Sequence, residues 1–430
     1  MPTPPPPSLR QPKAVQAVRF ASSQKRFFES AAHLGDTFQV NFQRRRWNVV
    51  THPDAVKEVF TGSPEVLHAG KGNDILATAL GEHSVLILDE DEHMRHRKLL
   101  LPSFHGERLA AQAETIQRIA GREVERIPRD GSFSMRDHSQ AIALEVILEI
   151  VLGTESTGSE HDELAGHATR TLEWISKPFR LLPPGLLGPR HPLVRRMYRP
   201  VLDPLDESLY RLIRERRREP DLDERSDILS MLLTARDEQG NPMSDEEVRD
   251  EIVTLIVAGH ETTATALAWA FERLAHTEGS TEALHRAVDE GDDEYVTAVV
   301  QETLRLRPVL DVVVRQVNRP VEIAGYAFQP GEMVVPCIHL VHRREDVYPD
   351  PLEFRPSRWK DEKPGTYTWI PFGGGVRRCI GASFAMAEME IVIKEVAKAG
   401  VLEPVGGDEE VVQRFITSSP ARGGELRFTH

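Results

Sequence analysis

The chain has 430 residues, 40% of them hydrophobic, which is enough apolar material for a substantial core. Its formal net charge is −14, with 53 basic residues scattered among 67 acidic ones, and this balance argues against nucleic acid as a partner. Only two cysteines are present, so a disulfide framework is excluded and a reducing compartment is indicated.

No apolar run approaches the ~20 residues of a spanning helix, and the N-terminus lacks the apolar stretch of a signal peptide. The sequence therefore predicts a soluble, cytoplasmic protein with no integral membrane segment. Residues 1–20 are predicted to be a proline-rich lead-in, extended at its prolines, and residues 21–430 a single domain. The apolar stretch 179–190 carries two arginines. It is predicted to cap an apolar cavity, with peripheral contact to a membrane surface as the alternative.

The predicted elements run from a short hairpin to a series of helices. Alternation of apolar and polar residues around a basic turn predicts the hairpin over 36–50. Helical periodicity follows, and the predicted helices cover 107–127, 141–153, 202–219, 245–277, 281–289 and 293–306. Residues 321–336 return to strand alternation, the run after Cys379 is helical to about Gly400, and the tail ends in short strands. The predicted fold class is mainly α with a small β region.

The stretch PFGGGVRRCIG (371–381) places one of the two cysteines among glycines and arginines. It is not a phosphate-binding P-loop, which ends in Gly-Lys-Ser/Thr, and its glycine spacing fails the dinucleotide fingerprint. A zinc site requires further Cys or His ligands, and no second cysteine lies nearby. A single thiolate at Cys379 is what remains.

A thiolate is stabilised by backbone N–H groups, a helix N-terminus and nearby positive charge. Cys379 opens a helical run directly after two arginines, and Phe372 is placed to shield its sulfur. Gly375 and Gly381 remove side chains on both sides, so a flat cofactor could approach the backbone. These are the needs of a cysteine that ligates haem iron. The loop alone does not separate this hypothesis from a buried, inert cysteine on a glycine turn.

The predicted long helix begins at a capping box, Ser244 with Glu247, and would extend about 50 Å at ~1.5 Å per residue. Its middle holds the polar break AGHETT (258–263). Thr262 is predicted to bond back to the Ala258 carbonyl and bend the helix. A hydroxyl beside the carboxylate of Glu261 can hold a water and relay protons. The alternative, a glycine kink with a satisfied threonine, leaves the buried acid unexplained.

Two further segments carry paired charges. In ETLR, Glu302 and Arg305 share a helical face, and Arg358 of FRPSRW is predicted to complete a buried cluster with them. The alternative for Glu302 and Arg305 alone is a surface ion pair, which contributes little to stability. In HMRHR, His93 and Arg97 align at i, i+4, as suits recognition of a carboxylate. The alternative is a solvated basic face.

The four segments FGGGVRRCIG, AGHETT, ETLR and FRPSRW, in this order, closely resemble the cytochrome P-450 family of haem-thiolate monooxygenases. The resemblance spans the chain from about residue 30 to its end, so residues 21–430 are expected to form a single catalytic domain with a long central helix beside the haem. The cysteine loop matches the family signature at each defining position: Phe372, Gly375, Arg377, Cys379 and Gly381.

The resemblance implies haem b as cofactor, with Cys379 as the axial thiolate ligand of the iron. It implies that Thr262 and Glu261 form the catalytic acid–alcohol pair. The haem-binding residues it implies are His93, Arg97, Ala258, Arg315, Phe372, Gly375, Arg377, Cys379 and Gly381. The cluster of Glu302, Arg305 and Arg358 is expected to be structural. His260 occupies a position that is variable in the family and is expected to face away from the haem.

The implied reaction is hydroxylation or epoxidation of an apolar small molecule by O2. The predicted pocket walls, mostly aliphatic, are 70–88, 172–187, 255–262, 309–314 and 415–418. Electrons are expected from a separate ferredoxin and ferredoxin reductase, with Arg343, Arg344 and Arg378 as local basic surface. The alternatives are a peroxide-using peroxygenase and a non-catalytic haem-binding sensor. The second cysteine, Cys337, is predicted to serve packing alone.

Overall fold

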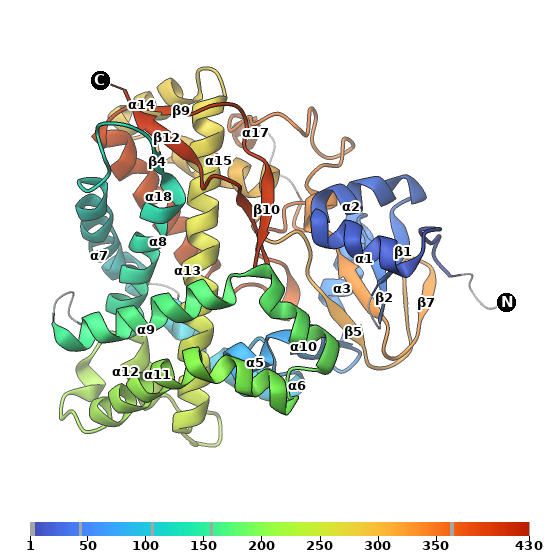
Figure 1. The fold of residues 1–430 in the computed structure, drawn as a ribbon, viewed down its shortest axis with the longest axis horizontal. Helices are drawn as coiled ribbons and strands as arrows, with labels where there is room; N and C mark the ends of the chain where they lie inside the picture. Colours follow the sequence, from blue (N-terminus) through green and yellow to red (C-terminus); the bar gives the residue numbers. More distant parts are fainter. Residues whose placement is uncertain (1–4, 43–44, 105–106, 155–157, 362–364, 430) are drawn as a thin grey trace.

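The computed structural model of the chain describes residues 5–42, 45–104, 107–154, 158–361 and 365–429. Figure 1 shows a large helical body and, beside it, a smaller part that contains a β-sheet and the helices nearest the N-terminus. The predicted fold class, mainly α with a small β region, is confirmed.

The helix α13 (Asp245–His276) crosses the helical body at its centre (Figure 1). Its capping box forms as predicted, because Ser244 Oγ accepts from the Glu247 N–H at 3.1 Å and Glu247 Oε2 accepts from the Ser244 N–H at 2.7 Å. The helix has 32 residues, which at ~1.5 Å per residue is about 48 Å. Most of its side chains are buried, so it is the axis on which the other helices pack.

The other long helices surround α13. They are α7 (Glu107–Val124), α8 (Met135–Val146), which runs into a π turn (Ile147–Val151), α9 (Ser159–Ile175), α11 (Pro192–Arg216), α14 (Ser280–Glu290), α15 (Asp293–Leu306) and α18 (Ala382–Ala399). The helix predicted over 202–219 begins ten residues earlier, because the buried face at Val194, Tyr198 and Leu202 continues through Pro200 and Pro204. The sequence pattern did not predict α9.

The shorter helices connect these elements. They are α1 (Lys13–Ser22), α2 (Gln24–Ala31), α3 (Pro53–Thr61), α4 (Gly70–Asn73), α5 (Ala77–Leu80), α6 (Glu90–Leu100), α10 (Leu182–Leu187), α12 (Ile228–Thr234), α16 (Ile338–Val341) and α17 (Arg358–Asp361).

The main sheet has the strand order β1-β2-β8-β5-β3. The predicted hairpin forms β1 (Thr37–Phe42) and β2 (Arg45–Val50), whose turn at 43–44 lies outside the described residues. The remaining strands of the sheet are β3 (Leu67–His68), β5 (Arg315–Val317) and β8 (Met333–Pro336), the last parallel to β2. The predicted strands over 321–336 are β6 (Val321–Ile323), β7 (Tyr326–Phe328) and β8.

The C-terminal strands form two small sheets. One pairs β10 (Val411–Arg414) with β11 (Thr417–Pro420), and the other orders β4 (Phe133–Ser134), β12 (Glu425–Phe428) and β9 (Leu402–Pro404). The β10–β11 turn holds Phe415 at φ 54°, a strained angle for a residue with a side chain. This turn reaches the apolar core around α13, since Phe415 is buried within that cluster.

The N-terminal segment joins the folded unit before residue 21. The Leu9 N–H donates to the Gln39 carbonyl at 3.0 Å, so residues near Ser8 extend the edge of β1. The predicted lead-in over 1–20 also contains most of α1, whose Gln16 is buried. Among the described residues, no helix is both long and apolar enough to cross a membrane.

Candidate functional site

The cysteine loop is closed by its own backbone. The Cys379 N–H donates to the Phe372 carbonyl at 2.9 Å, and the Arg378 N–H donates to the Gly375 carbonyl at 3.1 Å. Gly381 then caps α18, so Cys379 lies just before a helix N-terminus, as predicted. The Cys379 thiol is accessible, whereas the Cys337 thiol is buried in the apolar cluster near the N-terminus.

Two opposite influences act on the pKa of the Cys379 thiol. Surrounding protein raises the pKa of the thiol, while a hydrogen bond from the Gly381 N–H and the charges of Arg97 and Arg378 lower it. Of the two arginines in the loop, only Arg378 acts on the sulfur, because Arg377 is turned toward another partner.

Gly375 and Gly374 lie against Phe60 of α3. A Cβ on Gly375 would lie 1.8 Å from the Phe60 carbonyl oxygen, and a Cβ on Gly374 would lie 2.3 Å from the Phe60 ring. Gly375 also adopts φ 64°. These glycines therefore let α3 pack against the loop. At Gly381 the expectation of open space holds, since a Cβ there meets nothing within 4 Å.

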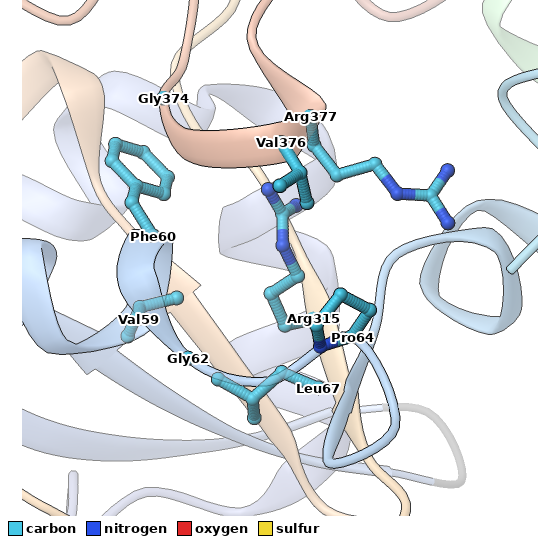
Figure 2. Close-up of a pocket in the computed structure, with 9 residues that line it drawn as sticks. All are labelled: Val59, Phe60, Gly62, Pro64, Leu67, Arg315, Gly374, Val376 and Arg377. Atoms are coloured by element: carbon cyan, nitrogen blue, oxygen red, sulfur yellow. The ribbon is translucent and has the colours of Figure 1, made fainter. Parts of the chain in front are cut away.

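Phe60 and the loop enclose a small cavity of about 10 Å³ (Figure 2), comparable to a single water. Figure 2 shows Arg315 reaching from its strand toward the loop, while Arg377 extends from the loop to the other side. The contact made by Phe60 was not predicted from the sequence, because it depends on how α3 packs.

The four residues His93, Arg97, Arg315 and Arg377 come together from three separate elements. His93 and Arg97 lie on α6, Arg315 on β5 and Arg377 in the cysteine loop. Burial and the charges of the three arginines lower the pKa of His93 to about 3. Burial and the charge of Arg377 lower the pKa of Arg315 to about 10. Each residue therefore lies in the field of the others, and we call the four the cationic cluster.

Among the described residues, the cationic cluster pairs with one carboxylate, that of Asp89. Arg377 donates to Asp89 Oδ1 at 2.7 Å and to the Val85 and Leu88 carbonyls. Arg315 donates to the carbonyl of the adjacent Val314 at 2.8 Å. Sequence reasoning missed Asp89, although it occupies the position before α6 where a capping acid is expected.

Two members of the cluster have polar nitrogens without a hydrogen-bond partner among the described residues. In the described part of the chain, the Arg97 guanidinium has no hydrogen bond or ion pair, and His93 Nδ1 is buried without a partner. Buried donors are normally satisfied, so this arrangement fits an anionic group that brings several acceptor oxygens. The two propionates of haem b meet that requirement.

The middle of α13 has the predicted hydroxyl bond. Thr262 Oγ1 donates to the Ala258 carbonyl at 2.6 Å, and the side chain is half-buried between buried neighbours. A Cβ on Gly259 would lie 3.3 Å from Ile147 Cδ1, so this glycine lets the π turn pack against α13.

The carboxylate of Glu261 is held on the α8 side of α13. Arg136 Nη2 donates to both of its oxygens, at 2.8 and 2.9 Å, and Gln140 Nε2 donates at 2.9 Å. Both Glu261 oxygens are therefore engaged by α8, while the Thr262 hydroxyl bonds within α13. Arg136 and Gln140 were missed, although their i, i+4 spacing was a readable signal.

His260 lies within reach of the charge of Arg136. Its side chain is buried, Nδ1 has no partner, and burial with the charge of Arg136 lowers its pKa to about 4. The imidazole is therefore neutral near pH 7.

The cluster of Glu302, Arg305 and Arg358 forms as predicted. Arg305 donates to both oxygens of Glu302 at 2.8 Å, and Arg358 Nε donates to Oε1 at 2.9 Å. Trp359 Nε1 and the backbone N–H of Arg355 add bonds of 3.0 and 2.9 Å, which sequence reasoning did not foresee. The remaining Arg305 donors reach the carbonyls of His342, Pro351 and Glu353.

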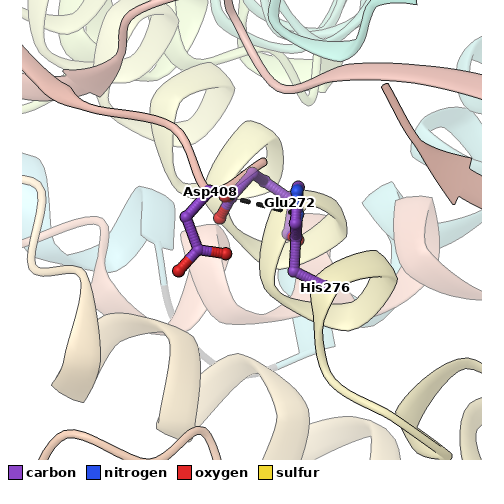
Figure 3. A group of neighbouring side chains, drawn as sticks. All are labelled: Glu272, His276 and Asp408. Carbon is purple, nitrogen blue, oxygen red and sulfur yellow. Dashed lines mark hydrogen bonds and ion pairs between the residues drawn. The ribbon is translucent and has the colours of Figure 1, made fainter. Parts of the chain in front are cut away.

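One group in the described residues has the composition of a metal site, Glu272, His276 and Asp408 (Figure 3). The guanidinium of Arg273 donates to Glu272 and, at 2.9 Å, to Asp408. An arginine therefore already supplies the positive charge that these carboxylates require.

A solved structure has the same fold over nearly the whole chain. The cyanobacterial CYP120A1 with bound retinoic acid superposes with a TM-score of 0.83 at 22% identity, covering 99% of both chains. The architecture is thus that of a cytochrome P450, the class of protein that carries haem b on a cysteine thiolate.

Sequence comparison assigns the family. A profile described as cytochrome P450 matches residues 2–399. The chain is 39% identical over 434 residues to cytochrome P450 135B1 of Mycobacterium bovis, covering 98% of this chain and 91% of that protein. It is 36% identical over 433 residues to cytochrome P450 135A1 of Mycobacterium tuberculosis, covering 98% and 94%. The chain belongs to the cytochrome P450 family, and the expected haem b cofactor and monooxygenase class follow from that membership.

Proposed function

We propose that this chain is a monooxygenase that inserts one atom of O2 into a C–H or C=C bond of an apolar small molecule. The observation that carries the proposal is an accessible thiol, Cys379, beside a cationic cluster with unpaired donors. When bound, haem b supplies the activation of dioxygen, and a thiolate ligand favours O–O cleavage. The chain's own side chains supply binding, orientation and protons.

Cys379 is the proposed iron ligand. Its sulfur receives the Gly381 N–H and the charges of Arg97 and Arg378, all of which favour the thiolate. The Cys337 thiol also receives backbone hydrogen bonds, but burial and the charges of Asp311 and Glu29 raise its pKa far above the usual range. Phe372, Gly375 and Gly381 hold the loop in shape, and Arg377 ties it to Asp89.

The cationic cluster is the proposed binding site for the haem propionates. Arg97 and His93 offer donors that no described residue occupies, and Arg315 offers most of its guanidinium. Carboxylates placed there would also relieve the mutual repulsion that lowers the pKa of His93. Ala258, whose carbonyl holds the Thr262 hydroxyl, is the proposed contact to the opposite face of the haem.

Thr262 is the proposed proton-handling residue, with Glu261 as its distant source. The Thr262 hydroxyl donates its own hydrogen to the Ala258 carbonyl, so its oxygen is left to accept from a water. Glu261 must leave Arg136 and Gln140 before it can pass a proton to that water. The ion pair therefore makes proton delivery conditional on a side-chain rotation.

The proposed substrate is an apolar molecule, because four predicted wall segments contribute to one aliphatic cluster. Leu76, Leu172, Leu181, Leu255 and Phe415 all belong to it or pack against it. Such walls stabilise an apolar ligand by burial and offer few polar groups for orientation.

A ferredoxin with its reductase is the proposed electron source, but the basic surface is smaller than predicted. Arg343 pairs with Glu29, and Arg344 pairs with Asp36 and Asp346. Of these three arginines, Arg378, which is exposed next to Cys379, is the one with no carboxylate partner among the described residues.

The test is the absorption spectrum of the reduced, carbon-monoxide-bound holoprotein, followed by turnover. A thiolate-type spectrum and product formation with NADPH, ferredoxin, reductase and O2 are expected. Product formed with hydrogen peroxide alone, at a rate above the O2-driven one, would instead identify a peroxygenase. A thiolate spectrum without product or ligand-induced spin shift over a broad apolar library would favour a sensor.

A further inference from the structure

The segment around α10 exposes an unusual concentration of large apolar side chains. Phe179, Leu182, Leu186, Leu187 and Leu193 are 54%, 59%, 65%, 50% and 63% exposed. Within the described residues these are five of the ten exposed large hydrophobic side chains, and they fall within 15 positions. We call these five residues the α10 patch. Exposed apolar groups scattered singly are ordinary, but a contiguous group indicates an interaction site.

The α10 patch belongs to an ordered segment whose inner side is anchored. Pro184 is buried, Thr78 Oγ1 donates to the Pro189 carbonyl at 2.7 Å, and Tyr198 Oη donates to the Arg180 carbonyl at 3.0 Å. The guanidinium of Arg180 lies 4.0 Å from the Trp174 ring centroid. Figure 1 places α10 at the bend between α9 and α11, on the outside of the helical body. The apolar side chains are therefore held outward by the fold.

Basic residues surround the patch in a chain that is acidic overall. Between Glu173 and Asp203 there is no acidic residue, while the chain as a whole carries a formal charge of −14. The basic residues in this interval are Lys177, Arg180, Arg190, Arg195, Arg196 and Arg199. Arg190 and Arg195 pair with Glu82. Lys177, Arg196 and Arg199 are exposed, so the surroundings of the patch are positively charged.

We propose that the α10 patch docks the protein on the surface of an anionic lipid bilayer. The apolar side chains would enter the headgroup boundary, and the lysine and arginines would face lipid phosphates. A second copy of the chain is disfavoured as the occupant, because two identical patches would bring their positive charges together. Since no described helix spans a membrane, the contact is interfacial. This proposal does not depend on the proposed function.

The test measures co-sedimentation of the holoprotein with vesicles of phosphatidylcholine, alone or mixed with phosphatidylglycerol. Binding is expected only to the anionic vesicles and is expected to weaken with added salt. The triple variant Leu182→Ser, Leu186→Ser, Leu187→Ser should bind at least tenfold more weakly, because each buried CH₂ contributes to insertion. Arg196→Gln with Arg199→Gln should weaken binding by roughly 20–30-fold, given about fivefold for each basic residue.

The matched control is Leu352→Ser, which removes an equally exposed leucine (67%) outside the patch and should bind like the parent. Retention of the carbon-monoxide spectrum shows that each variant is folded. Failure of the parent to bind anionic vesicles, or undiminished binding by the leucine triple variant, would overturn the proposal. Concentration-dependent self-association that the same triple variant abolishes would overturn it in favour of a second copy.

Discussion

The Glu302 cluster and the cationic cluster are two groups of neighbouring charges, and they differ in how their hydrogen bonds are satisfied. In the Glu302 cluster, both carboxylate oxygens and the Arg305 donors have partners within 3.0 Å. In the cationic cluster, the Asp89 carboxylate accepts from Arg377 alone, and His93 Nδ1 has no described partner. A saturated cluster stabilises the fold, whereas an unsaturated one is arranged for a ligand.

The energetic consequences of the two arrangements are opposite. Removing a member of a saturated buried network leaves an uncompensated charge, which destabilises the folded protein. Removing a charge from a group of repelling cations relieves that repulsion and costs the apo-protein little. The comparison therefore separates residues that maintain the fold from residues that bind a cofactor.

The largest expected effect is that of Glu302→Ala. This substitution leaves the buried charges of Arg305 and Arg358 without their carboxylate. It should lower the free energy of unfolding by roughly 3–5 kcal/mol. Denaturant unfolding of purified protein, or the yield of folded protein, measures the loss. Glu403→Ala, which removes an exposed partner of Arg427, is the control and should cost about 0–1 kcal/mol. An equally small loss for both variants would contradict the structural assignment.

The Glu302 cluster also predicts the direction of a pH dependence. Burial raises the pKa of Glu302, but the hydrogen bonds and charges of Arg305 and Arg358 outweigh it and leave the pKa below its usual value. Its contribution to stability is therefore complete above the unfolded-state pKa of about 4.3 and is lost as the pH falls through the folded-state pKa. Acid unfolding curves should show the parent losing more stability below pH ~4 than a Glu302→Gln variant does.

Cys379→Ser should abolish the thiolate-type carbon-monoxide spectrum and the O2-dependent activity. The replacement removes the sulfur that Gly381, Arg97 and Arg378 stabilise as thiolate. Cys337→Ala is the matched control, because its thiol is buried among apolar residues, and it should keep the spectrum at some cost in packing. If Cys337→Ala lost the thiolate spectrum and Cys379→Ser retained it, the ligand assignment would be reversed.

Arg97→Leu should weaken haem binding while leaving the apo-protein about as stable as the parent. Charge-assisted hydrogen bonds contribute about 1.5–3 kcal/mol each, so a loss of roughly 10–150-fold in haem affinity is expected. Haem titration and denaturant unfolding of the apo-protein supply the two measurements. Arg427→Leu, at an exposed pair, is the control for the loss of an arginine. Strong destabilisation of the apo-protein by Arg97→Leu would place Arg97 with the structural cluster.

The smallest expected change in binding is that of Thr262→Ala, which acts on proton delivery. Haem content and substrate affinity should stay near those of the parent, while product formed per NADPH consumed falls roughly tenfold or more and hydrogen peroxide rises. Thr263→Ala removes a neighbouring buried hydroxyl and serves as the control. Coupling by Thr262→Ala at the parental level would show that another group or a water chain handles the proton.

Several features of the site were predictable because they depend on neighbours in the sequence. The capping box at Ser244, the bond from Thr262 to Ala258 and the Glu302–Arg305 pair all join residues three or four positions apart on a helix. The position of Cys379 before α18 likewise follows from the adjoining helical pattern. Helical geometry fixes these contacts before any packing occurs.

The features that were missed or misjudged join residues far apart in the chain. Phe60 of α3, which packs against Gly375, was missed. Arg136 of α8, which binds the Glu261 carboxylate, was missed as well. Arg343 and Arg344 were expected to form a basic surface, but Glu29 and Asp36 neutralise them. Each error concerns a partner supplied by another element.

The sequence by itself determined the chemistry of this protein: a lone cysteine before a helix, a polar break in a long apolar helix, and charge pairs at helical spacing. Local backbone geometry is sufficient to place those groups. The tertiary structure decided which charges remain unpaired, since Asp89 reaches Arg377 and Arg136 reaches Glu261 across 288 and 125 positions. A side chain's nearest partner depends on how helices and strands pack, and packing minimises the exposed apolar area of the whole chain at once.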